Sequence, residues 1–193
     1  MNIQFLDFDP EVALRHLETL GGTSFPVLEQ RTRLLLLRAA YDQNYTKRPE
    51  ESSAGVRQDI WGCDDVVGSA IPGFRDAWQQ FLMEKFAGRE IFSPQLDFNE
   101  IFLQRYEPKS FGITPHTDRK IYQNLVCTFS LSGNCRFCLC DDREGSNPIH
   151  LDTTPGNVIL LRAPGFMGAD VRPFHFVEKI EGPRHTIGLR QKI

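Results

Sequence analysis

The fold is decided by the stretch Asn99–Asp118, NEIFLQRYEPKSFGITPHTD, in which two short β-type runs flank a turn-forming segment. Runs rich in β-branched and aromatic residues, broken by Gly, Pro and Asn, are typical of short strands. Seven such runs lie within residues 98–193: NEIFLQRY, GITPHTD, NLVCTFSLS, CRFCLCD, GNVILLRAP, PFHFVEKI and RHTIGLRQ. So many short strands at close spacing predict an antiparallel sandwich or barrel.

The first half of the chain has a different pattern, which predicts helices. The expected elements are helices from Asp9 to Gly21, over Val27–Gln43 and over Pro72–Phe86, and a polar loop or lid over Asn44–Gly62. Helices followed by strands predict an α+β, mostly β protein whose helices pack outside the β core. We therefore expect one domain over 1–193, with residues 1–97 as helical support and lid and residues 98–193 as the core.

The composition is that of a folded globular protein, because 40% of the 193 residues are hydrophobic and 24% are charged. No apolar run approaches the roughly 20 residues that cross a bilayer. The N-terminal stretch MNIQFLDFDPE also lacks the apolar core of a secretion signal. The net charge of −3 gives no global sign of a nucleic-acid-binding domain, which is usually basic. Five cysteines favour free thiols in a reducing compartment, and we expect a cytoplasmic location with no membrane association.

His116 and Asp118 lie two positions apart in ITPHTD, so a strand would point both side chains to the same side. An imidazole and a carboxylate on one face suit Fe(II), Mn(II) or Zn(II), although two ligands do not make a site. His175, in PFHFVEKI, is the candidate third ligand; the alternative is a core histidine with a hydrogen-bond partner. The remaining histidines, expected to be surface, rim and packing residues, are His16, His150 and His185.

The run RHTIGLRQ carries two arginines on one face, since Arg184, Thr186 and Arg190 alternate with apolar residues. A buried arginine is costly unless it meets an anion, and no acid occupies the intervening positions of this strand. A bound carboxylate ligand is therefore a natural partner, with a structural ion pair as the alternative. Gln104 and Tyr106 share a face of FLQRYEP and offer an amide and a phenol to the same cavity.

Three neighbouring cysteines, Cys135, Cys138 and Cys140, raise the alternative of a zinc site. A structural zinc usually takes four ligands from two paired turns, and the sequence has no second Cys-x-x-Cys pair. We therefore interpret these residues as buried strand cysteines.

Taken in order, LQRYEPKSFGITPHTD, His175 and RHTIGLR resemble the Fe(II)/2-oxoglutarate-dependent dioxygenases, most closely the AlkB-like branch. The resemblance covers residues 98–193, roughly half the chain. It implies a double-stranded β-helix core of the jelly-roll or cupin-like type. It also implies Fe(II), 2-oxoglutarate and O2 as cofactor and cosubstrates, with ascorbate as an aid in vitro, and His116, Asp118 and His175 as the iron ligands and catalytic centre.

The resemblance further implies how 2-oxoglutarate would be held. Arg184 and Tyr106 would bind its distal carboxylate, while Arg190, Thr186 and Gln104 would support the end that chelates iron. AlkB-type repair enzymes have asparagine where this chain has Gln104 and Thr186, which leaves these two contacts open.

The expected substrate is a small molecule, which could be anionic, hydroxylated at a C–H bond with release of succinate and CO2. AlkB-type repair enzymes carry a second acid two residues after the metal aspartate, whereas this chain has Lys120 there. The alternatives are oxidative demethylation of alkylated nucleic acid, hydroxylation of a protein, and a cupin-like binding domain without turnover. The residues expected to contact substrate, drawn from the lid and the rim loops, are Trp61, Arg119, Lys120, Asn124, Phe166 and Arg172.

Overall fold

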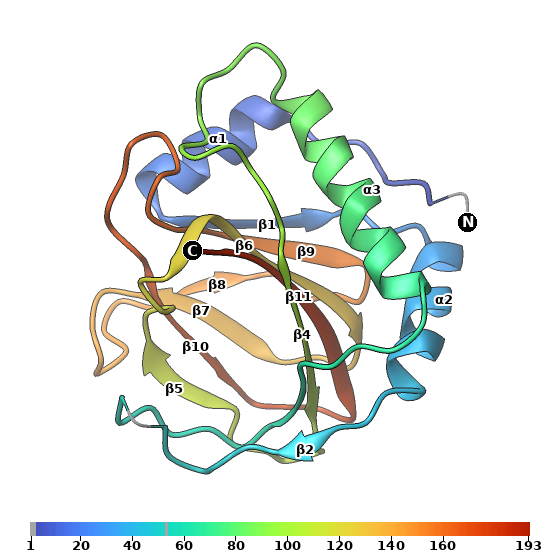
Figure 1. Ribbon diagram of the computed structural model, residues 1–193. Coiled ribbons are helices and arrows are strands. Elements are labelled where there is room, and N and C mark those ends of the chain that lie inside the picture. Colours follow the sequence, from blue (N-terminus) through green and yellow to red (C-terminus); the bar gives the residue numbers. More distant parts are fainter. Residues whose placement is uncertain (1–2, 53) are drawn as a thin grey trace.

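The computed structural model of the protein describes residues 3–52 and 54–193 (Figure 1). Its helices are α1 (Pro10–Thr19), α2 (Gln30–Tyr41) and α3 (Ala70–Lys85). Its strands are β1 (Gly22–Pro26), β2 (Thr46–Lys47), β3 (Trp61–Cys63), β4 (Glu100–Tyr106), β5 (Ile113–His116), β6 (Tyr122–Ser132), β7 (Arg136–Cys140), β8 (Ile149–Leu151), β9 (Asn157–Arg162), β10 (Phe174–Glu178) and β11 (Arg184–Lys192). Of the described helices, none has the length and apolar character to cross a membrane.

The strands form two antiparallel sheets that pack against each other. The larger has the order β1-β9-β6-β11-β4-β3-β2 and the smaller the order β5-β10-β7-β8. From β4 onward the chain passes back and forth between the two sheets, and apolar side chains of both, including Val126, Leu161, Phe137 and Val177, form one buried cluster between them. The prediction of a mostly β protein with a jelly-roll core is thus confirmed.

The helices cover the outer face of the larger sheet, away from β5, β10, β7 and β8 (Figure 1). Residues three or four apart lie on one helix face, and Phe74, Trp78 and Leu82 of α3 are all fully buried, as expected from their spacing. The Trp78 ring meets the ring of Phe129 on β6 edge-on, with centroids 5.1 Å apart. At the start of α1 the carboxylate of Asp9 caps the helix by accepting a hydrogen bond from the main-chain N–H of Glu11.

Two parts of the predicted element map need correction. β1 directly follows the glycines that end α1 and pairs with β9, although its sequence GTSFP has no strand periodicity. The expected lid is a loop only in its middle, because β2 and β3 at its ends extend the larger sheet beyond β4. Both differences have one cause: these short strands at the two ends of the sheet are stabilised by main-chain pairing with other segments, which a local pattern does not encode.

Candidate metal centre

The structure brings His116, Asp118 and His175 together at one end of the space between the sheets. Their ligand atoms all lie within 4.8 Å of one another, and His175 Nε2 is 3.9 Å from Asp118 Oδ2. Within residues 3–52 and 54–193 this is the one group of three such side chains with metal-ligand spacing. Two ligands on a common ion lie about 4 Å apart at most, so small side-chain adjustments would place all three atoms on one metal.

Antiparallel pairing of β5 with β10 sets this arrangement, since His116 and His175 are direct cross-strand partners. Gly112, just before β5, permits the approach of the two segments. Its φ is +83°, and a Cβ at this position would lie 1.9 Å from the carbonyl oxygen of Val177 on β10. Only glycine fits such a position without displacing the strand that carries His175.

Main-chain carbonyls orient both imidazole rings. Nδ1 of His116 lies 2.8 Å from the carbonyl oxygen of Thr114, and Nδ1 of His175 lies 3.2 Å from that of Pro173. A carbonyl oxygen only accepts hydrogen bonds, so each Nδ1 carries the proton and each Nε2 presents a lone pair to the cluster. The Phe137 ring stacks almost parallel to His175, 5.5 Å away between centroids, and restricts the ring further.

The local electrostatics favour the metal-binding forms of two ligands. Burial, together with the proximity of His175, lowers the pKa of His116 to about 4, which keeps this imidazole neutral near pH 7. Burial acts to raise the pKa of Asp118, but attraction to His175 and Arg190 outweighs it and the pKa is lowered overall. A neutral imidazole beside an ionised carboxylate is the donor set that a divalent cation requires.

An inner chamber between the two sheets is lined by the three residues of the cluster and by Arg184. This side chain is 1% exposed, and neither its Nε nor its Nη2 has a hydrogen-bond partner among the described residues. Its guanidinium carbon lies 5.1 Å from the ring centre of Tyr106, its cross-strand partner. Unpartnered buried donors are costly, so this part of the chamber fits a ligand carboxylate.

The polar side chains between Arg184 and the metal cluster follow the pairing of β4 with β11. Thr186 pairs with Gln104, and its hydroxyl lies 3.3 Å from the Gln104 Oε1. The Tyr106 hydroxyl is the same distance from that oxygen. The face predicted from alternation therefore exists, with Gln104 at its centre.

Arg190, the second arginine on this face of β11, has an acidic partner. Its Nη1 lies 3.3 Å from Glu100 Oε1 and 3.3 Å from the hydroxyl of Tyr122, and its positive charge acts on Asp118. The ion pair considered as an alternative for both arginines is therefore present at Arg190. Its partner, Glu100, lies on the neighbouring strand, where inspection of one strand could not reveal it.

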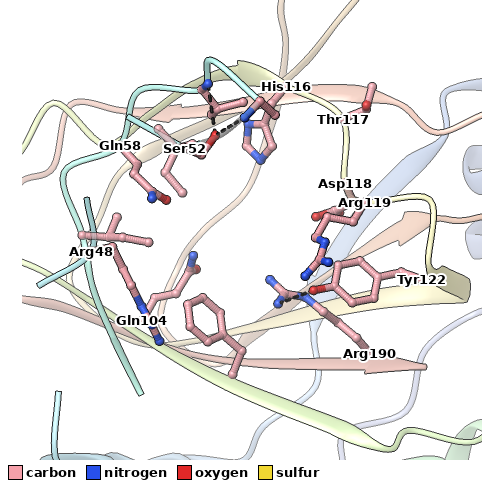
Figure 2. A pocket seen from close by; sticks show the side chains of 15 residues that line it. Arg48, Ser52, Gln58, Gln104, His116, Thr117, Asp118, Arg119, Tyr122 and Arg190 are labelled. Atoms are coloured by element: carbon pink, nitrogen blue, oxygen red, sulfur yellow. Dashed lines mark hydrogen bonds between the residues drawn. The ribbon is translucent and has the colours of Figure 1, made fainter. Parts of the chain in front are cut away.

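An outer cavity of about 510 Å³ opens beside the cluster, a volume within the range of small-molecule sites (Figure 2). Of the residues expected to contact substrate, Arg119 lines this cavity. The sequence did not single out Phe102 or Tyr122, which also line it. Phe102 could have been found, because it shares the strand face of Gln104.

Three expected substrate contacts do not fit the structure. Asn124 is fully buried, with its amide nitrogen bonded to Pro94 O (2.7 Å) and Gln191 Oε1 (2.6 Å). Phe166 is fully buried and packs against Phe92. Trp61 stacks on Arg105, on the face of the larger sheet opposite to Gln104.

The last two expected contacts lie near the cavity without lining it. Arg172 donates a hydrogen bond to the main-chain carbonyl of Asp118, so it supports the loop that carries this ligand. Lys120 is exposed.

His185, expected to be a packing residue, lies against Tyr41 of α2 with ring centroids 4.6 Å apart.

No protein-family model and no curated protein matches the chain. Solved structures do resemble it. A 2OG-Fe(II) oxygenase family oxidoreductase from Burkholderia pseudomallei is 10% identical, with a TM-score of 0.70 over 96% of this chain and 91% of that one. A Trichoplax adhaerens prolyl hydroxylase, solved with a peptide fragment of hypoxia inducible factor, is 12% identical, with a TM-score of 0.69 over 94% and 88%.

A prolyl-4-hydroxylase from Pseudomonas putida is 13% identical, with a TM-score of 0.67 over 95% of this chain and 98% of that one. The first of these structures is thus a 2OG-Fe(II) oxygenase family member, and the other two are prolyl hydroxylases. At identities this low, the structural similarity establishes the architecture alone. That similarity extends over nearly the whole of each chain. The protein therefore has the fold of the 2-oxoglutarate- and Fe(II)-dependent oxygenases.

Proposed function

We propose that the protein is a non-haem Fe(II)- and 2-oxoglutarate-dependent dioxygenase that hydroxylates a C–H bond of a small molecule. The observation that carries this proposal is the placement of the His116, Asp118 and His175 cluster in a chamber that Arg184 also lines, with two guanidinium nitrogens that have no hydrogen-bond partner among the described residues. Three side chains with metal-ligand spacing and a buried guanidinium line the same chamber, which fits a metal and a dicarboxylate. The fold shared with oxygenases of this class supports the same function.

In this proposal His116, Asp118 and His175 would hold the iron. When bound, iron and 2-oxoglutarate supply the oxidising power: O2 is consumed, succinate and CO2 are released, and a substrate C–H becomes C–OH. Arg184 and Tyr106 bind the distal carboxylate of 2-oxoglutarate. Gln104 and Thr186 offer polar atoms along its length.

The remaining walls of the chamber exclude water. Val126, Phe137, Leu161 and Val177 surround the space between the metal ligands and Arg184. Apolar walls strengthen the attraction between the guanidinium and a carboxylate, because water cannot screen it. They also limit side reactions of an activated oxidant with solvent.

Hydroxylation of a peptide side chain is the second candidate, since two of the similar structures are prolyl hydroxylases. AlkB-type demethylation of nucleic acid has less support. The basic lid residues that would contact a phosphate backbone already have acidic partners: Lys47 with Asp59, Arg48 with Asp64 and Arg57 with Glu50. A surface neutralised in this way attracts a polyanion weakly.

Succinate formation tests the proposal. The purified protein would receive Fe(II), ascorbate, 2-oxoglutarate and O2, together with a metabolite pool, a proline-containing peptide or a methylated oligonucleotide. We expect Fe(II)-dependent succinate that rises with the metabolite pool and falls at least about 100-fold in His116→Ala, because a transition metal with two ligands is held poorly. His16→Ala, on α1, is the matched control. If none of the three additions gives Fe(II)-dependent succinate, the proposal that the protein is an enzyme of this class is wrong.

A further inference from the structure

Among the residues that the structure describes, one arginine lining the outer cavity has no acidic partner. Three arginines line it, Arg48, Arg119 and Arg190, together with the metal ligand Asp118. Arg48 Nη2 lies 2.5 Å from Asp64, and Arg190 Nη1 lies 3.3 Å from Glu100. Arg119 forms no ion pair with any residue that the structure describes.

Of the described charged residues that line the two cavities, Arg119 is the one whose formal charge is not cancelled in the loaded site. In the proposed function, Fe(II), Asp118, dianionic 2-oxoglutarate and Arg184 cancel one another. The pairs of Arg48 with Asp64 and of Arg190 with Glu100 cancel as well. A concave site with one uncompensated positive charge attracts a ligand that carries one negative charge.

Arg119 is placed to meet such a ligand beside the metal. It directly follows Asp118 in the chain, and Figure 2 shows it on the same side of the cavity as Asp118, Tyr122 and Arg190. Arg48 and Gln104 lie on the opposite side. The planar guanidinium can hold a carboxylate through two hydrogen bonds at once.

The rest of the cavity favours an apolar body. Its apolar lining residues come from the 52–60 segment, from β4 and from β5, and they are Ala54, Val56, Ile60, Phe102 and Ile113. The Phe102 ring is flanked by Arg48 and Arg190, whose guanidinium carbons lie 5.3 and 4.9 Å from its centre. A ligand chain can therefore pack on Phe102 and the aliphatic side chains while its charged end faces Arg119.

We propose that the substrate is a small carboxylic acid with an apolar chain, and that Arg119 binds its carboxylate. This inference rests on the proposed function and names the class of substrate for the same cavity. It assigns Arg119 a substrate-binding role and distinguishes it from Arg184, which would bind the carboxylate of the cosubstrate.

The test compares acids with their uncharged amides. The whole protein, loaded anaerobically with Mn(II) and 2-oxoglutarate, would be titrated with butanoate, hexanoate and octanoate and with the matching amides, and binding measured by calorimetry. The same compounds would then be tested for Fe(II)-dependent succinate formation. We expect each acid to bind at least about tenfold more tightly than its amide, and Arg119→Gln to remove that difference.

Arg31→Gln, an exposed arginine of α2, is the matched control and should keep the preference for acids. Binding of 2-oxoglutarate to the Mn(II)-loaded protein is measured first, and its absence would overturn the proposed function together with this inference. If 2-oxoglutarate binds but acids and amides bind equally, or if Arg119→Gln keeps the preference, the inference alone is wrong. Succinate formation stimulated only by the peptide or only by the oligonucleotide would also overturn it.

Discussion

The two faces of β11 carry opposite kinds of residue. On the outer face, Ile187 and Leu189 are fully buried in the cluster that also holds Trp78 and Phe129. On the inner face, Arg184 is just as deeply buried but keeps donors without partners among the described residues. Burial of apolar groups is what stabilises a fold, whereas a buried unpaired donor costs stability unless a ligand meets it. One strand thus separates a face that stabilises the protein from a face that we propose binds the cosubstrate.

This comparison predicts that substitutions on the two sides of the larger sheet have separable effects. Outside the sheet, a truncated side chain should lower the free energy of unfolding and leave ligand affinity unchanged. Inside, a truncated polar side chain should lower ligand affinity and leave the free energy of unfolding the same or higher.

The largest effect is expected from Trp78→Ala on the outer side. The indole is fully buried and its N–H lies 3.5 Å from the sulfur of Cys127. We expect the free energy of unfolding to fall by about 3–5 kcal/mol, because the change leaves a large cavity. Urea denaturation followed by circular dichroism measures it.

Trp78→Phe, which fills most of the same space, is the milder companion and should lose less stability. Calorimetry on the folded variant should give a 2-oxoglutarate dissociation constant within about twofold of the wild-type value, since Trp78 lies outside the sheet. A large change in that constant in Trp78→Phe would contradict the separation of the two faces.

The next effect is expected from Arg184→Met on the inner side. Methionine fills a similar volume but offers no donor, so 2-oxoglutarate affinity should fall about 100-fold, equivalent to about 2.7 kcal/mol. The free energy of unfolding should stay the same or rise, because the substitution removes a buried charge that has no ion-pair partner among the described residues. Calorimetry with the Mn(II)-loaded protein and urea denaturation give the two values.

Arg184→Lys keeps the charge and should retain part of the affinity for 2-oxoglutarate. Lysine attracts a carboxylate through its charge but cannot form the two parallel hydrogen bonds of a guanidinium. If Arg184→Met binds 2-oxoglutarate with unchanged affinity, the proposal that Arg184 binds its carboxylate is wrong. A loss of stability comparable to that of Trp78→Ala would show that Arg184 is structural instead.

The features that could be predicted from the sequence are those that depend on local residue order. Alternation within a strand is local, so the shared faces of Gln104 with Tyr106 and of Arg184 with Thr186 follow from residue order alone. The amphipathic spacing of Phe74, Trp78 and Leu82 is local in the same way. Bringing His175 to His116, however, requires the pairing of β10 with β5, which is not local; the resemblance to a known family implied the ligand set but not this pairing.

The failures concern residues outside such patterns. Asn124 and Phe166 were assigned to the rim, but Asn124 has a positive φ of 58° and satisfies surrounding polar groups from inside the protein. Trp61 was assigned to a lid, but β3 pairs with β4 and points this side chain away from the cavity. In each case the direction of a side chain depends on a long-range contact, and local sequence carries no record of it.

The smallest effect is expected from His185, a titratable residue on the outer face of β11. Burial, with a further contribution from the charge of Arg105, lowers the pKa of His185 to about 4. Its Nδ1 lies 3.2 Å from the hydroxyl of Ser132. In the unfolded chain a histidine takes up its proton near pH 6.5, so between about pH 6.5 and 4 the unfolded state binds a proton that the folded state does not.

This difference gives the sign of the pH dependence. The contribution of His185 to stability is fully present above about pH 6.5 and is lost as the pH falls toward 4, by about 1–2 kcal/mol between pH 7 and 5. His185→Phe keeps a ring against Tyr41 but cannot take up a proton, so its free energy of unfolding should fall less over the same interval. The free energy of unfolding of both proteins would be measured by urea denaturation at pH 7, 6 and 5. If it falls by the same amount in both, His185 takes up its proton in the folded state as readily as in the unfolded chain. The outer face of β11 would then tolerate a charge that the comparison with Ile187 and Leu189 excludes.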